Sequence, residues 1–209
     1  MSKKKGLFIV FEGGEGSGKT TQIKLLKDDL ELRGFKVVAT REPGGTQTGE
    51  KIREILKDPT LPKTSLSELL LFNASRNCHV EQKILPAKEA GEVVISDRFY
   101  DSTIAYQCGG RGIDYDLVNK INMLAAEKCK PDMVFVLFRD IKKGLNDAKM
   151  VSAKEDHFEK EKLDFHERVH NEYKKIVKRD LKNHKIIDGN KSIEEVHQDI
   201  IKEVNKLLK

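Results

Sequence analysis

The chain has 209 residues, of which 38% are hydrophobic and 35% are charged, so we expect one hydrophobic core beneath a strongly charged surface. No apolar run approaches the roughly 20 residues of a membrane span, which excludes an integral membrane protein, and we expect no secretory signal. The net charge of +5 is small, and the absence of Trp together with 6% aromatic residues argues against a nucleic-acid-binding protein. Three cysteines without a C-x-x-C pair favour a reduced protein of the cytoplasm.

Short apolar runs alternate with longer helical patterns, which is typical of an α/β fold with a mostly parallel sheet. The runs are rich in Val, Ile and Phe, as strands buried on both faces are. The predicted strands are Leu7–Phe11, Lys36–Thr40, Val93–Ser96, Met133–Phe138 and Lys185–Ile187. No repeat or composition break marks a second domain, so residues 1–209 are expected to form a single domain.

A glycine-rich segment after the first strand matches the P-loop pattern G-x-x-x-x-G-K-[ST]. Its glycines allow the backbone to wrap around a phosphate, and N–H groups of the loop and of the following helix point at the phosphate oxygens. Lys19 is expected to reach the β- and γ-phosphates, and the Thr20 hydroxyl is expected to ligate Mg²⁺. The expected ATP-binding residues are Gly13, Gly14, Glu15, Gly16, Ser17, Gly18, Lys19, Thr20 and Thr21.

Charged residues follow the second and third predicted strands. The helix after the P-loop, Gln22–Leu32, ends before Gly34, and Arg41 stands just after the strand that comes next, in the string R-E-P-G-G-T. Asp97 and Arg98 directly follow the third strand. Because open parallel sheets bind ligands at the carboxyl ends of their strands, these side chains are expected beside the P-loop.

A long helix is predicted from a capping box of Ser65 with Glu68, and it extends to Leu85, just before a proline. Phe72 and Arg76 lie four residues apart on this helix and therefore share one face. An aromatic ring and a planar donor on one face can stack on a base and hydrogen-bond its edge. This helix is the candidate for base recognition.

The segment 142–162 is dense in charge and poor in apolar residues, which predicts a short mobile lid. The helical pattern behind it contains H-E-x-x-H, and two histidines on one face of a helix can bind zinc, as in metalloproteases. No clear third ligand accompanies His166 and His170, so solvated helix charges are the better interpretation. A second capping box, Ser192 with Glu195, begins the last helix.

A P-loop alone does not distinguish kinases from GTPases, motors and nucleotide-holding switches. A GTPase requires a guanine-reading N-K-x-D string, and the nearest match, at residues 119–122, ends in Asn. Motors are usually longer than this chain, and a switch has no need of an acceptor pocket. The remaining interpretation is a compact kinase with a small phosphate acceptor.

With these motifs in this order, the sequence resembles the thymidylate kinase family. The matching strings are F-E-G-G-E-G-S-G-K-T-T-Q, T-R-E-P-G-G-T, L-L-L-F-N-A-S-R and D-R-F-Y-D-S-T-I-A-Y-Q, which span most of the chain. The resemblance implies a five-stranded parallel sheet flanked by helices on both faces, usually in a homodimer. It also implies transfer of the γ-phosphoryl group of ATP to dTMP, giving dTDP, with Mg²⁺ as cofactor; dUMP is the nearest alternative acceptor.

The resemblance further implies which residues hold dTMP. Glu15 contacts the deoxyribose 3′-hydroxyl, and Arg41 and Arg98 hold the phosphate. Phe72 stacks on thymine, and Arg76 donates to its O4. A dianionic monoester is expected to bind charge-assisted donors such as arginine, in agreement with these roles.

The segment after the third strand contributes the remaining implied roles. Ser102, Thr103 and Gln107 lie along the base and sugar. Tyr106 stands where a ribose 2′-hydroxyl would lie. Asp97 organises the water shell of Mg²⁺, so Asp97 joins Lys19 and Arg98 as an expected catalytic residue.

The sequence departs from the family in its cations. Some members carry a P-loop arginine where this chain has Gly16, and others carry lid arginines with a D-R-x-E string. Here no arginine lies between Asp140 and Glu167, and the string at 156–159 is D-H-F-E. We expect Lys149 or Lys154 to close over the γ-phosphate, although a lysine lacks the bidentate fork, and the alternative is that both lysines are solvated lid charges.

Overall fold

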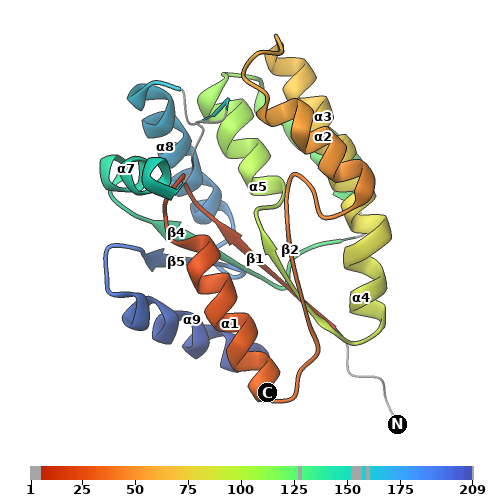
Figure 1. Ribbon diagram of the computed structural model, residues 1–209, viewed down its shortest axis with the longest axis vertical. Helices are drawn as coiled ribbons and strands as arrows, with labels where there is room; N and C mark the ends of the chain where they lie inside the picture. The colour runs from red at the N-terminus through yellow and green to blue at the C-terminus, as the bar shows by residue number, and fades with distance from the viewer. Residues whose placement is uncertain (1–5, 127–128, 152–156, 159–160, 209) are drawn as a thin grey trace.

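Five parallel strands form the centre of the molecule in the computed structural model, which describes residues 6–126, 129–151, 157–158 and 161–208. The strand order is β2-β3-β1-β4-β5, so the strand that leads into the P-loop is central (Figure 1). Each predicted strand bound lies within one residue of the observed bound. The strands are β1 (Leu7–Glu12), β2 (Val37–Arg41), β3 (Val93–Asp97), β4 (Met133–Phe138) and β5 (His184–Asp188).

Helices cover both faces of the sheet, which confirms the predicted α/β class (Figure 1). On one face lie α1 (Lys19–Leu32) and α9 (Ile193–Leu207). On the opposite face lie α3 (Ser65–His79), α4 (Leu85–Glu89), α5 (Tyr100–Thr103) with its π-helical continuation η2 (Ile104–Gly110), α6 (Tyr115–Ala126) and α8 (Leu163–Arg179). Outside this layer, α2 (Gln47–Lys57) packs on α3, and α7 (Ile141–Val151) packs on α8.

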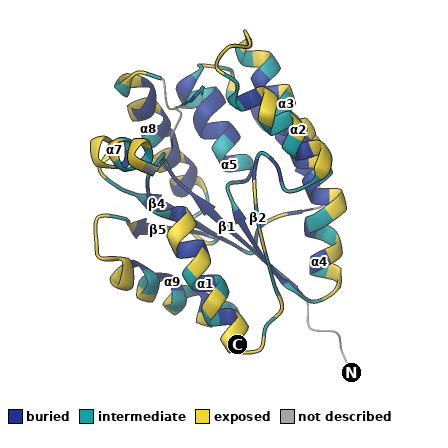
Figure 2. Cartoon of the chain, viewed as in Figure 1, coloured by how far each residue is buried: buried dark blue, intermediate teal, exposed yellow. Residues whose placement is uncertain are grey.

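Successive residues of β1 face opposite layers. Phe8 and Val10 belong to the cluster under α3 and α8, whereas Ile9 and Phe11 belong to the cluster under α1 and α9. All four side chains are fully buried, and Figure 2 shows the central strands β1, β3 and β4 mostly buried between helices whose outer sides are exposed. A strand covered on both faces has no solvent-facing side, which explains why these strands are continuous apolar runs in the sequence.

The long helix predicted before Pro86 continues beyond it. α3 passes into a π-helical turn, η1 (Val80–Ile84), and then into α4, which ends at Glu89. Proline lacks an N–H and its ring collides with the preceding turn of a regular helix. The wider π-helical turn and the position of Pro86 in the first turn of α4 accommodate it.

The helix starts are only partly as predicted. The Ser65–Glu68 capping box is wrong, because Thr64 caps α3 by accepting a hydrogen bond from the Ser67 N–H. The capping box of Ser192 at the start of α9 is confirmed. Glu68 instead forms ion pairs with a distant arginine, as described below.

The lid was predicted at residues 142–162, and its first half is a helix rather than a loop. α7 occupies Ile141–Val151, and residues 152–156 and 159–160 lie outside the described residues. Within the part of the chain that the structure describes, none of the helices is long and apolar enough to cross a membrane.

Candidate active site

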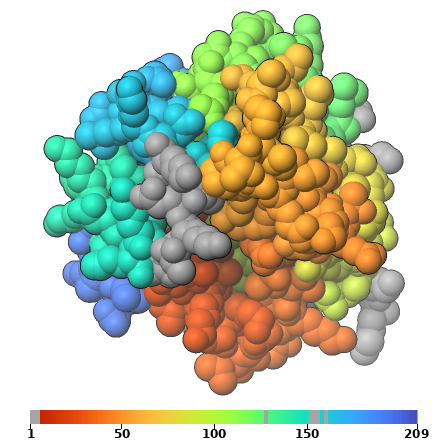
Figure 3. All heavy atoms as spheres, turned by 45° about the horizontal axis from the view of Figure 1, so that its top comes forward, coloured from red at the N-terminus to blue at the C-terminus, as the bar shows by residue number. Residues whose placement is uncertain are grey.

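The carboxyl ends of β1, β2, β3 and β4 border a cavity of about 750 Å³. Figure 3 shows this end of the molecule, with α7 and α8 on one side and the residues of α2 and α3 on the other. Predicted site residues from every motif line the cavity: Glu15, Gly16, Ser17, Gly18, Lys19, Thr20, Thr21, Arg41, Phe72, Arg76, Asp97, Arg98, Ser102, Thr103, Tyr106 and Gln107. The parallel sheet therefore brings together side chains that lie up to about ninety residues apart in the sequence.

Lys19 is buried and folded back onto its own loop. Its Nζ donates to the carbonyl oxygens of Gly14 at 2.8 Å and Gly13 at 3.1 Å, and to Ser17 Oγ at 3.2 Å. Burial, followed by repulsion from Arg98, lowers the pKa of Lys19 to about 8. An incoming phosphate would replace these carbonyl oxygens as the partner of the ammonium group.

The P-loop packs directly on α7 through two glycines. Gly16 has φ +62°, and a Cβ on it would collide with the carbonyl oxygen of Gly144. A Cβ on Gly144 would in turn lie 2.6 Å from the carbonyl oxygen of Glu15. Position 16 therefore has no room for a side chain, arginine included, while the loop stays packed on α7.

Thr20 and Asp97 provide oxygen ligands of the kind that Mg²⁺ prefers. The Thr20 hydroxyl donates to Asp97 Oδ2 at 3.1 Å. Asp97 Oδ1 is buried and has no hydrogen-bond partner among the described residues. An unsatisfied buried carboxylate oxygen beside a P-loop hydroxyl fits the predicted metal site.

Arg98 lies beneath the P-loop in a left-handed backbone conformation, with φ +74°. Its Nη2 pairs with Glu15 Oε1 at 2.7 Å, and its Nη1 donates to the Gly13 carbonyl oxygen at 2.9 Å. The Tyr106 hydroxyl also donates to Glu15 Oε1, at 2.8 Å. Although burial acts in the opposite direction, Arg98 and then Lys19 lower the pKa of Glu15 to about 2. The carboxylate is therefore charged at neutral pH.

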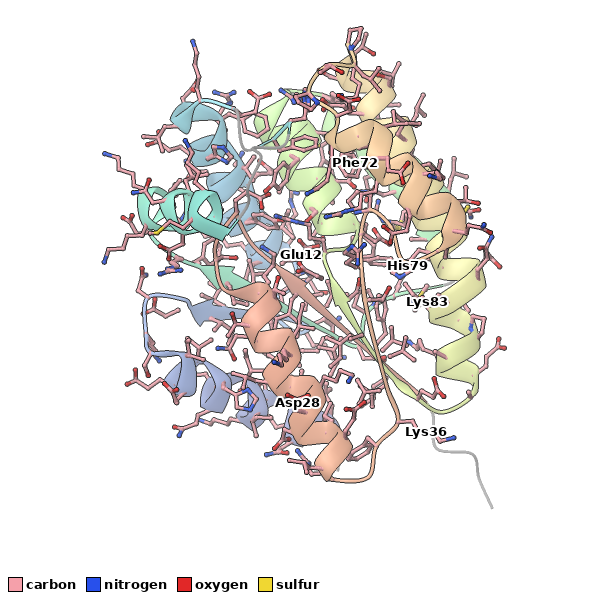
Figure 4. All side chains as sticks on the ribbon, in the orientation of Figure 1. Glu12, Asp28, Lys36, Phe72, His79 and Lys83 are labelled. Atoms are coloured by element: carbon pink, nitrogen blue, oxygen red, sulfur yellow. The ribbon has the colours of Figure 1, made fainter. Side chains whose placement is uncertain are left out.

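Glu12, at the end of β1, is a buried carboxyl group that no motif predicted. It accepts hydrogen bonds from the Phe99 N–H at 2.8 Å, the Ser102 N–H at 3.1 Å and the Tyr173 hydroxyl at 2.8 Å. Burial, followed by repulsion from Asp101, raises its pKa to about 7. Figure 4 labels Glu12 at the end of β1, and its bonds to the N–H groups of Phe99 and Ser102 hold the start of α5 in position. An acidic residue ending an apolar strand is the sequence signal that identifies it.

Arg76 is fully buried, with 1% of its side chain exposed, and bonds several polar groups at once. Its Nε donates to Glu42 Oε2 at 2.8 Å, and its Nη2 donates to Thr103 Oγ1 at 2.9 Å. Its Nη1 donates to Asn122 Oδ1 at 2.9 Å and to Asn73 Oδ1 at 3.2 Å. These bonds fix the guanidinium plane against the cavity.

Glu42 and His79 support Arg76 from behind, and neither was predicted from the sequence. His79, fully buried on α3, bonds Glu42 Oε1 at 2.9 Å through Nδ1 and Thr40 Oγ1 at 2.8 Å through Nε2. Figure 4 shows His79 on the same helix as Phe72, about two turns further along it. The Glu42–Pro43 peptide bond is cis.

Aromatic rings line the acceptor side of the cavity. The Phe158 ring centroid lies 5.7 Å from that of Phe72 and 5.7 Å from that of Tyr106. Gln107 is buried beside them, and its Oε1 has no partner among the described residues. The segment expected to form the end of the lid therefore contributes a ring to this pocket.

His157, which stands where related lids carry the arginine of D-R-x-E, contacts α3. Its Nε2 lies 2.7 Å from Glu68 Oε1 and 3.2 Å from Arg111 Nη2. Arg111 pairs with Glu68 at 3.0 Å and also with Glu161. His157, Arg111 and Glu68 thus form a hydrogen-bonded cluster beside these aromatic rings.

Lys149 and Lys154 were predicted to be lid cations. Lys149 is exposed on α7 and is not among the described residues that line the cavity, and Lys154 lies outside the described residues. Arg41 lines the cavity and pairs with Glu50 at 2.8 Å. Two further cavity-lining arginines, Arg53 and Arg139, belong to no predicted motif.

The H-E-x-x-H histidines do not form a recognisable metal site. Among the described residues, no group of three or more His, Cys, Asp or Glu side chains is placed to hold a metal ion. The His170 ring packs on Phe138 with centroids 4.9 Å apart, and burial lowers the pKa values of His166 and His170. His166 is buried rather than solvated, so the interpretation of this motif as solvated helix charges is wrong for that residue.

The family model described as thymidylate kinase matches residues 11–200 of the chain. The chain belongs to the thymidylate kinase family. Thymidylate kinase of Halothermothrix orenii is 44% identical over 206 residues, covering 98% of this chain and 99% of that one. Thymidylate kinase of Pelotomaculum thermopropionicum is 45% identical over 206 residues, covering 98% and 95%. A crystal structure of thymidylate kinase from Ehrlichia chaffeensis has a TM-score of 0.79 at 37% identity, covering 96% and 98%.

Family membership accounts for the two halves of the cavity. The activity is that of a thymidylate kinase, which binds ATP and phosphorylates dTMP to dTDP. The cavity of this chain has the P-loop on one side and the aromatic rings of Phe72, Tyr106 and Phe158 on the other.

Proposed function

We propose that the cavity holds both substrates together, with the phosphates of ATP in the P-loop and dTMP between α3 and the segment after β3. The observation that carries this proposal is that one continuous cavity is lined by Lys19 and Thr20 and also by Phe72, Arg76 and Gln107. Direct transfer requires donor and acceptor phosphates in contact with water excluded, which a shared cavity provides.

The acceptor base would be recognised by one donor and one acceptor. Arg76 uses four of its five N–H groups on Glu42, Asn73, Asn122 and Thr103, which leaves one on Nη2. Gln107 Oε1 is buried without a partner among the described residues. These groups complement the O4 acceptor and the N3–H donor of thymine, with Phe72 stacked on the ring.

The acceptor phosphate would draw arginines away from their carboxylate partners. Arg98 and Arg41 pair with Glu15 and Glu50 here, and a dianionic monoester attracts a guanidinium more strongly than one carboxylate does. Released from Arg98, Glu15 can accept a hydrogen bond from the sugar. Tyr106, bonded to Glu15, would then exclude a ribose 2′-hydroxyl.

In the reaction, a monoester oxygen of dTMP forms the bond to the γ-phosphorus, and the bond from that phosphorus to the β–γ bridging oxygen breaks, releasing ADP. Lys19 binds the phosphates as charge moves towards the bridging oxygen. Thr20 and Asp97 are the residues that would hold Mg²⁺, which neutralises phosphate charge when bound. Lys149 or Lys154 remains our predicted lid cation.

Release of ADP from MgATP with dTMP, dUMP, CMP, UMP, AMP or GMP tests this proposal. Strong turnover is expected with dTMP, and EDTA is expected to abolish it. The extra methyl group of thymine is worth about 1–3 kcal/mol, so dUMP is expected to be roughly 10- to 200-fold poorer. Turnover with a ribonucleotide would contradict the role of Tyr106, and hydrolysis that is independent of an acceptor would contradict the shared cavity.

We also infer that the protein is a homodimer of the cytoplasm. Leu66 and Leu70 on α3 are about half exposed, and Leu117 and Leu124 on the adjacent α6 are 44% and 78% exposed. Leucines spaced four and seven residues apart share one helix face, so they form an apolar surface suited to a second copy. The scattered cysteines support a reducing compartment.

A further inference from the structure

Arg139 is a cation of the cavity that no motif predicted. It directly follows β4, where its Nη1 donates to the Gly16 carbonyl oxygen at 3.0 Å and its Nη2 pairs with Asp147 of α7 at 2.7 Å. The side chain keeps 28% of its surface exposed. Two edges of a planar group are therefore bound, and its plane is held beside the P-loop with part of its surface open.

The strand order decides which substrate Arg139 can reach. β1 and its P-loop are central, and the acceptor residues Arg41 and Arg98 stand at the ends of β2 and β3, on one side of β1. Arg139 follows β4, on the other side. A triphosphate whose terminal phosphate faces the acceptor extends its nucleoside away from the acceptor, which places the nucleoside on the β4 side.

The loop after β5 adjoins Arg139 on this side. The Gly189 N–H donates to the Phe138 carbonyl oxygen at 2.7 Å, and the Asp140 N–H donates to Asn190 Oδ1 at 3.1 Å. A Cβ on Gly189 would lie 3.4 Å from the Cβ of Arg139. The ends of β4 and β5 therefore form one continuous wall next to the P-loop.

We propose that Arg139 binds the nucleoside half of the donor nucleotide, packing its guanidinium plane against the base while its edges stay bonded to Gly16 and Asp147. The inference rests on the proposed assignment of the P-loop to the donor phosphates. A guanidinium can stack on a base, whereas an ammonium group offers no plane. The lid of this chain contains no arginine, and Arg139 at the end of β4 would supply the arginine that contacts the donor nucleotide.

Two probes of the full-length protein test this proposal: AMP-PNP, which contains the nucleoside, and inorganic tripolyphosphate, which lacks it. Arg139→Ala is expected to weaken AMP-PNP binding about tenfold or more, in line with the loss of one stacking contact, and to leave tripolyphosphate binding within about twofold. Arg139→Lys is expected to behave like the alanine variant. In turnover, the KM for ATP is expected to rise in both variants while the KM for dTMP stays unchanged, which also reports that they are folded.

Lys143→Ala is the matched control, because it removes one exposed cation from α7 and is expected to leave both probes unaffected. Equal weakening of both probes in Arg139→Ala would overturn the nucleoside contact in favour of a phosphate contact. Unchanged AMP-PNP binding would overturn any donor role, and full recovery in Arg139→Lys would overturn stacking. Wild-type protein that bound neither probe would contradict the assignment of the P-loop itself.

Discussion

Arg76 neutralises the buried Glu42 carboxylate in addition to facing the cavity, and this second role governs how it can be tested. Arg76→Ala would leave a carboxylate that is 2% exposed without its guanidinium, at a cost of about 3–5 kcal/mol of stability. Loss of dTMP turnover in that variant would therefore mix unfolding with loss of recognition. A substitution at the neighbouring Gln107 avoids the ion pair.

Gln107→Leu is expected to lower kcat/KM for dTMP by about 10- to 100-fold, because the N3–H of thymine then lacks an acceptor. The KM for ATP and the melting temperature are expected to change little, since among the described residues the Gln107 side chain forms only a long 3.5 Å bond, to Glu68. Steady-state kinetics with each substrate varied in turn measures this. A parallel rise in the KM for ATP would contradict placement of the base at Gln107.

The lowered pKa of Lys19 gives a testable pH dependence. Above a pKa of about 8 the free enzyme loses the ammonium charge, so kcat/KM for ATP is expected to fall as the pH rises through 8. Bound phosphates favour the charged form and raise the pKa, so kcat at saturating ATP is expected to persist to higher pH. A kcat/KM profile for ATP that is flat from pH 7 to 9.5 would contradict this.

At the scale of an element, residues 157–158 connect the lid region to the acceptor pocket. The Phe158 ring contacts Phe72 and Tyr106, and His157 bonds Glu68 of α3. Phe158→Ala is expected to raise the KM for dTMP up to about tenfold through lost aromatic contacts, with little effect on the KM for ATP. Met150→Ala, at an 80% exposed position on α7, is the control. Equal effects on both substrates would indicate general disturbance of the lid.

The elements also mark where sequence reasoning succeeds and where it stops. The three central strands were predicted to within one residue because a parallel strand buried on both faces is a plain apolar run. The continuation of the helix from α3 into α4 was not predicted, because the π-helical turn that accommodates Pro86 leaves no signal in the sequence. Glu68 was interpreted as a helix cap although its partner, Arg111, lies 43 residues away.

Some residues of the site were predicted from the sequence and others were missed. Motifs predicted the residues that face the cavity, such as Lys19 and Arg98, because their chemistry requires a fixed spacing on one loop or strand end. The supporting residues Glu42 and His79 were missed, since a buried hydrogen bond between separate elements has no local pattern. Arg139 was missed for the same reason, as its partners are a distant carbonyl oxygen and a carboxylate.

For the whole molecule, the apolar surface of α3 and α6 predicts the assembly. Leu70→Glu combined with Leu124→Glu is expected to convert a dimer into a monomer, because two buried carboxylates would lack partners. Sedimentation equilibrium measures the mass. Leu32→Glu is the matched control, since Leu32 is 90% exposed but lies on α1, on the opposite face of the sheet. A monomeric wild-type protein would contradict the proposal.

The internal bonds of Lys19 and Arg98 have a consequence for selectivity against small anions. Each cation already holds oxygen atoms of the chain, so any ligand must compete with those atoms before it gains from the charge. A lone sulfate or orthophosphate ion offers only charge, whereas a nucleotide adds the contacts of its base and sugar. The internal bonds of Lys19 and Arg98 thus lower the affinity of the site for inorganic phosphate, and the site stays available to nucleotides in a medium rich in that ion.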